Sequence, residues 1–195
     1  MDDATLIAQI QAGNEHANRF LIEKFKNLVW HLVLRMVSQP EDAEDLCQEI
    51  FLRVFRDIGK FRGESKLSTW IGAIAYNMSV TYLRKKGKNI MVSVDDYLPV
   101  ASGKPAVESA DEALDKSSMK KVVHRIIDSL PVQYRTVITL FYLEELSYKE
   151  IEEVTGMPDG TIKSYLNRGR QAIREGVLQM VPDLRTEMMI SEKNQ

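Results

Sequence analysis

Apolar residues recur every three or four positions along most of this chain, and that spacing limits its fold more than any other feature. The first such stripe comprises Phe20, Leu21, Phe25, Leu28, Val29, Leu32, Val33 and Met36. A repeat of this kind places its members on one face of a helix, whereas a half-buried strand needs strict alternation. No segment shows a convincing alternation, so the sequence predicts an all-α fold.

Breaks in this pattern divide the chain into two parts. Gln39-Pro40 ends the first stripe, a second helix follows to about Ile58, and a third runs from about Ser68 to Lys86. From Gly87 to about Asp111 the periodicity fades, and a structureless run of that length is unusual inside one compact domain. We therefore predict two small helical domains joined by a flexible linker, which at roughly 25 residues reaches on the order of 80 Å when extended. The predicted ranges are 5–88 for the first domain, 89–111 for the linker, 112–178 for the second domain and 179–195 for the tail.

The stretch from Ser147 to Gly176 has the pattern of a helix-turn-helix. Ser147 and Glu150 form a capping box that begins a short helix, and Gly156 suits the left-handed conformation that ends it. A second helix follows, whose predicted buried face comprises Ile162, Leu166, Gly169 and Ile173. The side chains predicted to point outward are of types that bind base edges or phosphates, and the second helix of such a pair enters the major groove. These residues are Thr161, Lys163, Ser164, Tyr165, Asn167, Arg168 and Arg170.

Two basic segments stand out from an acidic background. The 195-residue chain has a net charge of −2, which by itself argues against nucleic acid as a partner. Residues 61–90, however, carry six Lys and Arg against one Glu, a net charge of +5. Residues 156–180 carry four Lys and Arg against two acids, a net charge of +2. Local positive charge counts for more than the average on a phosphate backbone, so both segments are candidate DNA-binding surfaces.

Several short motifs resemble one protein family. The motifs Leu130-Pro131, Tyr134-Arg135-Thr136-Val137, Leu146 to Ile151, Gly160 to Ser164 and Arg168-Gly169-Arg170 resemble region 4 of bacterial extracytoplasmic-function (ECF) sigma factors. Those from Asp42 to Phe51, Phe61 to Ser65, Ser68 to Ile71 and Ile74 to Asn77 resemble region 2 of the same family. The resemblance implies a region 2 helical bundle and a four-helix region 4 domain, and a sigma factor that directs promoter-specific transcription initiation. It also implies that the chain promotes strand opening.

The resemblance also implies roles for particular residues. Docking on the β′ clamp helices of core RNA polymerase falls on Asp42, Asp45, Gln48 and Glu49. Recognition of the −10 element falls on Phe61, Arg62, Trp70, Asn77, Arg84, Lys85 and Lys86. Recognition of the −35 element falls on Thr161, Lys163, Ser164, Tyr165, Arg168 and Arg170. Family members often carry a basic residue where Tyr165 stands, so the −35 sequence read by this chain is left open.

The physical properties of these residues suit such roles. Opening DNA requires an aromatic side chain that stacks on an unpaired base, a polar group for its edge and cations for the strand. Trp70 supplies stacking area, and Asn77 lies two helical turns further on nearly the same face.

Other protein classes find little support in the sequence. It contains no Ser/His/Asp set, phosphate-binding loop or metal-ligand cluster, so we expect a non-enzyme without metal or cofactor. With one cysteine, no secretion signal and no membrane-spanning run, we expect a cytoplasmic protein. The resemblance implies further partners, namely the polymerase β flap and an anti-sigma factor that can hold the chain at the inner membrane.

Two alternatives remain open at this point. One is a stand-alone regulator that binds its operator tightly through the helix-turn-helix without polymerase. The other is a protein-binding helical module that sequesters polymerase or an anti-sigma factor. The acidic motif around Asp45 and the aromatic residues around Trp70 argue against the first alternative.

Overall fold

The computed structural model describes residues 2–37, 39–87 and 116–180, and within these ranges the chain is helical with no strand. The N-terminal half contains α1 (Asp3–Gln11), α2 (Glu15–Met36), α3 (Pro40–Asp57), the 3₁₀ turn η1 (Ile58–Lys60) and α4 (Leu67–Lys85). The C-terminal half contains α5 (Lys116–Ser129), α6 (Val132–Tyr142), α7 (Tyr148–Thr155) and α8 (Asp159–Met180). The all-α prediction is confirmed. The predicted linker 89–111 and residues 181–195 of the predicted tail lie outside the described residues.

Local sequence signals account for most of the helix boundaries. The Asn14 side chain accepts hydrogen bonds from the first backbone amides of α2, and Pro40 is the first residue of α3. The capping box at α7 is complete, because Glu150 N–H donates to Ser147 Oγ at 3.3 Å and Ser147 N–H donates to Glu150 Oε2 at 2.8 Å. Gly156 then ends α7 at a φ of 70°, which favours glycine. Helix α1, capped by Asp2, was not predicted from the sequence.

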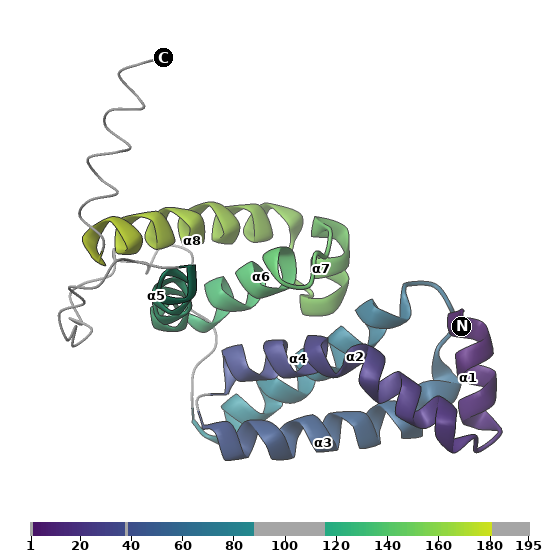
Figure 1. Ribbon diagram of the computed structural model, residues 1–195. Coiled ribbons are helices and arrows are strands. Elements are labelled where there is room, and N and C mark those ends of the chain that lie inside the picture. The colour runs from purple at the N-terminus through teal and green to yellow at the C-terminus, as the bar shows by residue number, and fades with distance from the viewer. Residues whose placement is uncertain (1, 38, 88–115, 181–195) are drawn as a thin grey trace.

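The N-terminal half is a bundle in which α2 packs against both α3 and α4, while α1 lies across one end (Figure 1). In the C-terminal half, α8 packs along α6 and is flanked by α5 and α7. Both cores consist of the apolar residues that recur at helical spacing, among them Leu32, Ile50, Ile71, Ile138 and Ile162. None of the described helices is long and apolar enough to span a bilayer.

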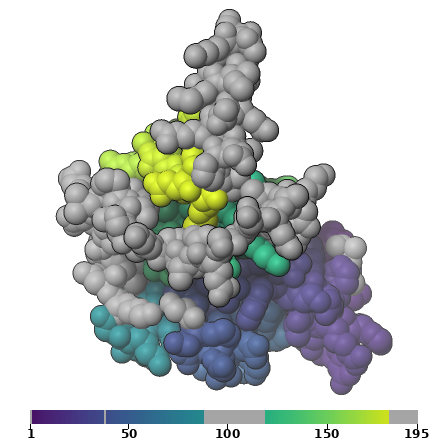
Figure 2. Space-filling model, turned by 60° about the vertical axis from the view of Figure 1, so that its left-hand side comes forward, coloured from purple at the N-terminus to yellow at the C-terminus, as the bar shows by residue number. Residues whose placement is uncertain are grey.

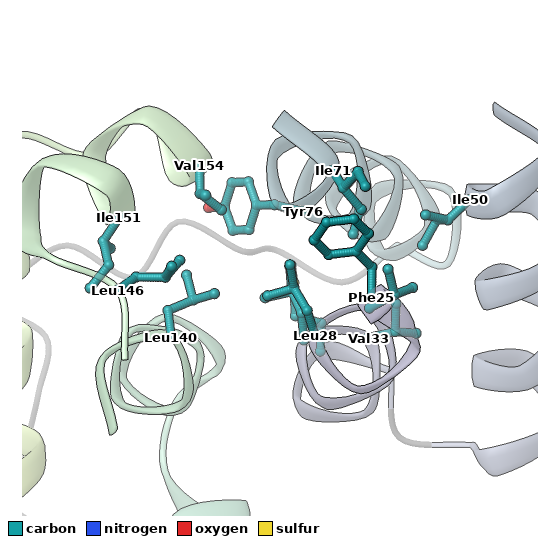
Figure 3. Close-up of a cluster of buried hydrophobic side chains, with 14 of the residues drawn as sticks. Phe25, Leu28, Val33, Ile50, Ile71, Tyr76, Leu140, Leu146, Ile151 and Val154 are labelled. Carbon is teal, nitrogen blue, oxygen red and sulfur yellow. The ribbon is translucent and has the colours of Figure 1, made fainter. Parts of the chain in front are cut away.

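The two halves pack on each other through helix pairs. Helix α4 lies against α7, and α2 lies against α6. Figure 2 shows the green and yellow C-terminal half lying over the purple and blue N-terminal half. Figure 3 shows buried side chains from both halves in one cluster, with Tyr76 of α4 pointing to Val154 of α7. The helices that carry the predicted DNA-binding residues therefore belong to a single packed body.

Candidate nucleic-acid interface

One face of α3 is exposed and lacks a neighbouring helix in the described part of the chain. Asp45, Gln48 and Glu49 lie on this face at the three-and-four spacing of a helix, and all three are exposed. Leu52 continues the same stripe and is 70% exposed, which is unusual for a large apolar side chain. Sequence reasoning missed Leu52, although its position three residues after Glu49 placed it on this face. The result is an acidic helix face with one apolar side chain.

Asp42 does not share the environment of these three residues. Its carboxylate accepts a hydrogen bond from the Tyr82 hydroxyl of α4, and Lys86 Nζ lies 3.7 Å from it. The hydrogen bond to Asp42 is the main cause of a raised Tyr82 pKa. Asp42 therefore ties the start of α3 to the end of α4, and its docking role stays a prediction. No local pattern indicates this contact, because Asp42 and Tyr82 are forty positions apart.

A groove of about 450 Å³ runs between the end of α3 and the outer face of α4. Trp70 and Asn77 both line it, as the sequence predicted from their separation of two helical turns. The Phe61 ring meets Trp70 edge-on, with ring centroids 5.6 Å apart and an interplanar angle of 61°. Phe61 thus packs against the Trp70 indole. The Asn77 side chain is exposed. The groove therefore has an aromatic surface and an amide on the same wall.

Basic residues on the opposite wall were not predicted. Arg53 and Lys60 line the groove and both pair with the buried carboxylate of Asp57, with Lys60 Nζ 2.6 Å from Asp57 Oδ1. The hydrogen bond from Lys60 is the main cause of a lowered Asp57 pKa, and the hydrogen bond from Arg53 lowers it further. An Arg and an Asp four residues apart on a helix are a visible signal for such a pair. The carboxylate fixes the two cations at the groove and partly neutralises them.

The basic residues predicted to contact the −10 element do not line this groove. Arg62 lies exposed in the loop before α4, and Arg84 and Lys85 are exposed in the last turn of α4. Lys86, in contrast, is held near Asp42 and over the Tyr82 ring, 5.5 Å from its centroid. Arg62, Arg84 and Lys85 are thus open to a phosphate, while Lys86 already has an acidic neighbour.

On α8, Lys163 and Arg170 are exposed, while Thr161, Ser164 and Arg168 are half-buried. The Lys163 ammonium lies 2.6 Å from Asp159 Oδ2, one turn earlier, and 5.6 Å from the centre of the Tyr148 ring. The hydrogen bond to Asp159 is the main cause of a raised Lys163 pKa. Arg170 Nε donates to the carbonyl oxygen of Leu166 at 3.3 Å. Asp159 therefore competes with any phosphate for Lys163.

The prediction that Tyr165 points outward is wrong. Its side chain is only 6% exposed, and its ring lies on Tyr134 of α6 with centroids 4.7 Å apart. The buried stripe of α8 includes position 165 because it lies three residues after Ile162 and four before Gly169. Burial is the main cause of a raised Tyr165 pKa. Tyr165 thus packs in the core in this arrangement and is not available to DNA.

Comparison with known proteins identifies the class to which this geometry belongs. The family profile described as Sigma-70 region 2 matches residues 21–89, and that described as Sigma-70, region 4 matches residues 120–173. The ECF RNA polymerase sigma-E factor of Haemophilus influenzae is 32% identical over 91% of this chain and 96% of its own length. The chain belongs to the ECF sigma factors of bacterial RNA polymerase.

Further relatives show the same extent of similarity to this sigma factor. The sigma-H factor of Pseudomonas aeruginosa is 31% identical over 88% of this chain and 91% of its own length. The ECF sigma factor SigW of Bacillus subtilis is 32% identical over 87% of this chain and 93% of its own length. As a member of this family, the chain is a factor for promoter-specific transcription initiation by core RNA polymerase.

Solved structures agree on the fold. The sigma factor RpoE from Bartonella quintana, in complex with the anti-sigma factor NepR, has a TM-score of 0.59 at 21% identity, covering 82% of this chain and 97% of its own. CnrH, in complex with the cytosolic domain of CnrY, has a TM-score of 0.61 at 16% identity, covering 89% of this chain and 95% of its own.

Proposed function

We propose that this sigma factor divides its task among three surfaces on α3, α4 and α8. The exposed face of α3 docks on the clamp helices of polymerase, the α4 groove holds the opened −10 strand, and α8 positions the factor on duplex DNA at −35. The observation that carries this division is the groove, in which Trp70 and Asn77 share one wall. Arg53 and Lys60 form the opposite wall. Its test is transcription with purified core enzyme on promoters of the source genome, where unchanged initiation would contradict it.

The groove suits a single-stranded base because each of its parts supplies one of the required interactions. A base stacks on an aromatic face, and such stacking contributes roughly 1–3 kcal/mol per base. The exposed Asn77 amide offers a donor and an acceptor for a base edge. Arg53 and Lys60 provide positive charge for the backbone alongside. The volume of about 450 Å³ leaves room for an unpaired nucleotide.

Helix α8 suits duplex DNA mainly through its phosphates. Lys163 and Arg170 are exposed, and Ser164 and Arg168 flank them. Phosphate contacts set the register of a protein on the duplex, whereas specificity requires base contacts. Because Tyr165 is buried, the base contacts of this helix are made by Thr161, Ser164 and Arg168.

We also propose that the chain acts without catalytic activity of its own and has an anti-sigma partner. The complexes of RpoE with NepR and of CnrH with CnrY support the second point, because these proteins share the fold of this chain. A stand-alone regulator, the alternative, would bind promoter DNA tightly without polymerase. Gel-shift assays with and without core enzyme separate the two, because our proposal requires polymerase for tight binding.

Reversing one charge on the α3 face should weaken polymerase binding. Glu49→Lys is expected to lower the affinity for core enzyme about tenfold, because interface residues with large effects typically contribute more than 1 kcal/mol each. The matched control is Glu23→Lys, which makes the same change at an exposed position on α2. Fluorescence anisotropy with purified core enzyme measures both variants. Equal affinities for the two would show that this face does not dock.

Neutralising Asp159 should strengthen duplex binding. Asp159→Asn frees Lys163 from its ion pair and should steepen the salt dependence of −35 duplex binding by about one unit, with tighter binding at low salt. The control is Glu175→Gln, an equal loss of charge at an exposed position further along α8. If both variants behave alike, Lys163 is not a phosphate contact.

A further inference from the structure

One carboxylate is shared between the helix predicted to dock on polymerase and the helix predicted to read the −10 element. Asp42, in the first turn of α3, accepts a hydrogen bond from the Tyr82 hydroxyl of α4. Lys86 Nζ, at the end of α4, lies 3.7 Å from Asp42 Oδ2 and 5.5 Å from the centre of the Tyr82 ring. Figure 1 shows that the start of α3 and the end of α4 meet at one end of the N-terminal bundle. These three residues form the Asp42 cluster, which bridges the two helices.

Asp42 also belongs to the exposed face of α3 by its position in the helix. It lies three residues before Asp45, a spacing that places two side chains on one side of an α-helix. Glu49 and Leu52 continue the row after further steps of four and three residues. The Asp42 side chain is 37% exposed, so part of its carboxylate is open to a partner. The cluster therefore lies where the face predicted to meet polymerase adjoins the basic end of α4.

The Asp42 carboxylate cannot hold Lys86 and a polymerase cation equally well. The Tyr82 hydroxyl and the Lys86 ammonium both approach Oδ2, whereas a carboxylate has lone pairs on two oxygens and can accept from a further donor. A second cation at Asp42 would repel the Lys86 ammonium and weaken its attraction to the carboxylate. Docking of a cation on Asp42 thus makes Lys86 available to another anion.

The end of α4 is suited to receive that anion. Arg84 and Lys85 are exposed in the last turn of α4, and the exposed Lys86 follows directly. In the free chain, Asp42 partly neutralises Lys86, as Asp159 partly neutralises Lys163 on α8. A strand phosphate at this end of α4 would therefore meet more positive charge once Asp42 is engaged by polymerase.

We infer that Asp42 couples polymerase docking to binding of the opened −10 strand, because a polymerase cation takes over its carboxylate and Lys86 then binds a strand phosphate. This inference rests on the proposed roles of the α3 face and the α4 groove. Coupling between two binding sites is reciprocal, so bound strand also raises the affinity for polymerase by the same factor. Tyr82 is a positioning residue in this scheme, since its hydroxyl holds the Asp42 carboxylate beside Lys86.

The coupling factor tests this inference directly. It is the ratio of two dissociation constants for a fork-junction DNA with a single-stranded −10 region from a promoter of the source genome, one for the free full-length chain and one for the chain bound to core enzyme. Core enzyme has DNA contacts of its own, but these are the same for every variant. We expect Asp42→Asn to lower the factor about two- to fivefold, which is the effect of one partly exposed ion pair. A loss of docking affinity alone leaves this ratio unchanged.

Double variants and a matched control assign the effect to the cluster. Lys86→Ala should lower the factor as much as Asp42→Asn, and the double variant should lower it no further, because both changes break the same path. Tyr82→Phe keeps the ring beside Lys86 but loses the hydroxyl, so its effect should be smaller. The control Glu23→Gln removes the carboxylate of an exposed ion pair with Lys26 on α2 and should leave the factor unchanged.

A salt titration of the free chain provides an independent measurement. Asp42→Asn releases Lys86 without polymerase, so a single-stranded −10 oligonucleotide should bind more tightly at low salt. The dependence of this binding on the logarithm of salt concentration should steepen by about 0.7, the value for one phosphate contact on a single strand. Adding Lys86→Ala should remove the gain. Unfolding would weaken binding, so the sign of the change separates this effect from a loss of structure.

The possible outcomes distinguish this inference from the proposed function. Equal coupling factors for wild type, Asp42→Asn and Lys86→Ala would overturn the inference, and so would additive losses in the double variant. A loss in Asp42→Asn alone would overturn the transfer of Lys86 to the strand. A wild-type factor of one would instead contradict the proposed function, because tight promoter binding would then not require polymerase.

Discussion

Replacing Trp70 with alanine is expected to slow promoter opening about 10- to 100-fold while leaving attachment to the upstream duplex unchanged. The reason is that a base held in the α4 groove loses its stacking surface, which contributes roughly 1–3 kcal/mol. Helix α8 does not contact this groove, so binding at −35 should be unaffected. Permanganate reactivity of unpaired thymines measures opening, and a gel shift at the −35 duplex measures attachment.

Two controls make this result specific. Trp70→Phe keeps an aromatic ring against Phe61 and should retain part of the activity, whereas general unfolding would affect every assay. A template with a preformed bubble should largely rescue Trp70→Ala only if the indole helps to open the duplex.

Asn77→Ala should shift the base preference at −10, whereas the control Asn27→Ala, at an exposed position on α2, should leave it unchanged. Equal opening by wild type and Trp70→Ala would remove the groove from the mechanism.

The local features of this sigma factor were readable from sequence because they depend on neighbours within a few positions. The helical periodicity, the capping box at Ser147 and the turn at Gly156 are each local patterns, and the structure contains all of them. Trp70 and Asn77 share a wall because a seven-residue separation on a helix brings them to one face. Helix α1 was missed because its nine residues carry only a short apolar stripe.

The remaining features depend on contacts between distant segments. Asp42 bonds to Tyr82 of another helix, and Arg53 and Lys60 meet Trp70 only after α3 and α4 pack together. Tyr165 has the spacing of the buried stripe of α8, but a tyrosine also suits a DNA-binding surface, and its packing on Tyr134 of α6 depends on the tertiary fold. The packing of the two halves was likewise beyond the sequence, since a long linker permits either separation or closure.

Substitution of Gly169 has the largest expected effect on stability, because α8 leaves no room for a side chain against α6 at this position. A Cβ at this position would lie 2.4 Å from Ile138 Cδ1 and 3.2 Å from Ile138 Cγ1, and Ile138 is itself 2% exposed with little room to move. Gly169→Val should therefore destabilise the protein by about 3 kcal/mol and lower its melting temperature by on the order of 10 °C. It should also weaken −35 binding, because Arg168 and Arg170 flank the displaced residue.

The same helix provides the matched control for this change. A Cβ at Gly160 would meet nothing within 4 Å, so Gly160→Val makes the same substitution in open space and should leave the melting temperature nearly unchanged. Adding Ile138→Ala to Gly169→Val removes the clashing atoms and should recover part of the lost stability, although Ile138→Ala alone destabilises by roughly 2–5 kcal/mol. Such recovery in a double-mutant cycle would demonstrate steric coupling between the two positions. Simple additivity of the two losses would show that the cost of Gly169→Val does not arise from a clash with Ile138.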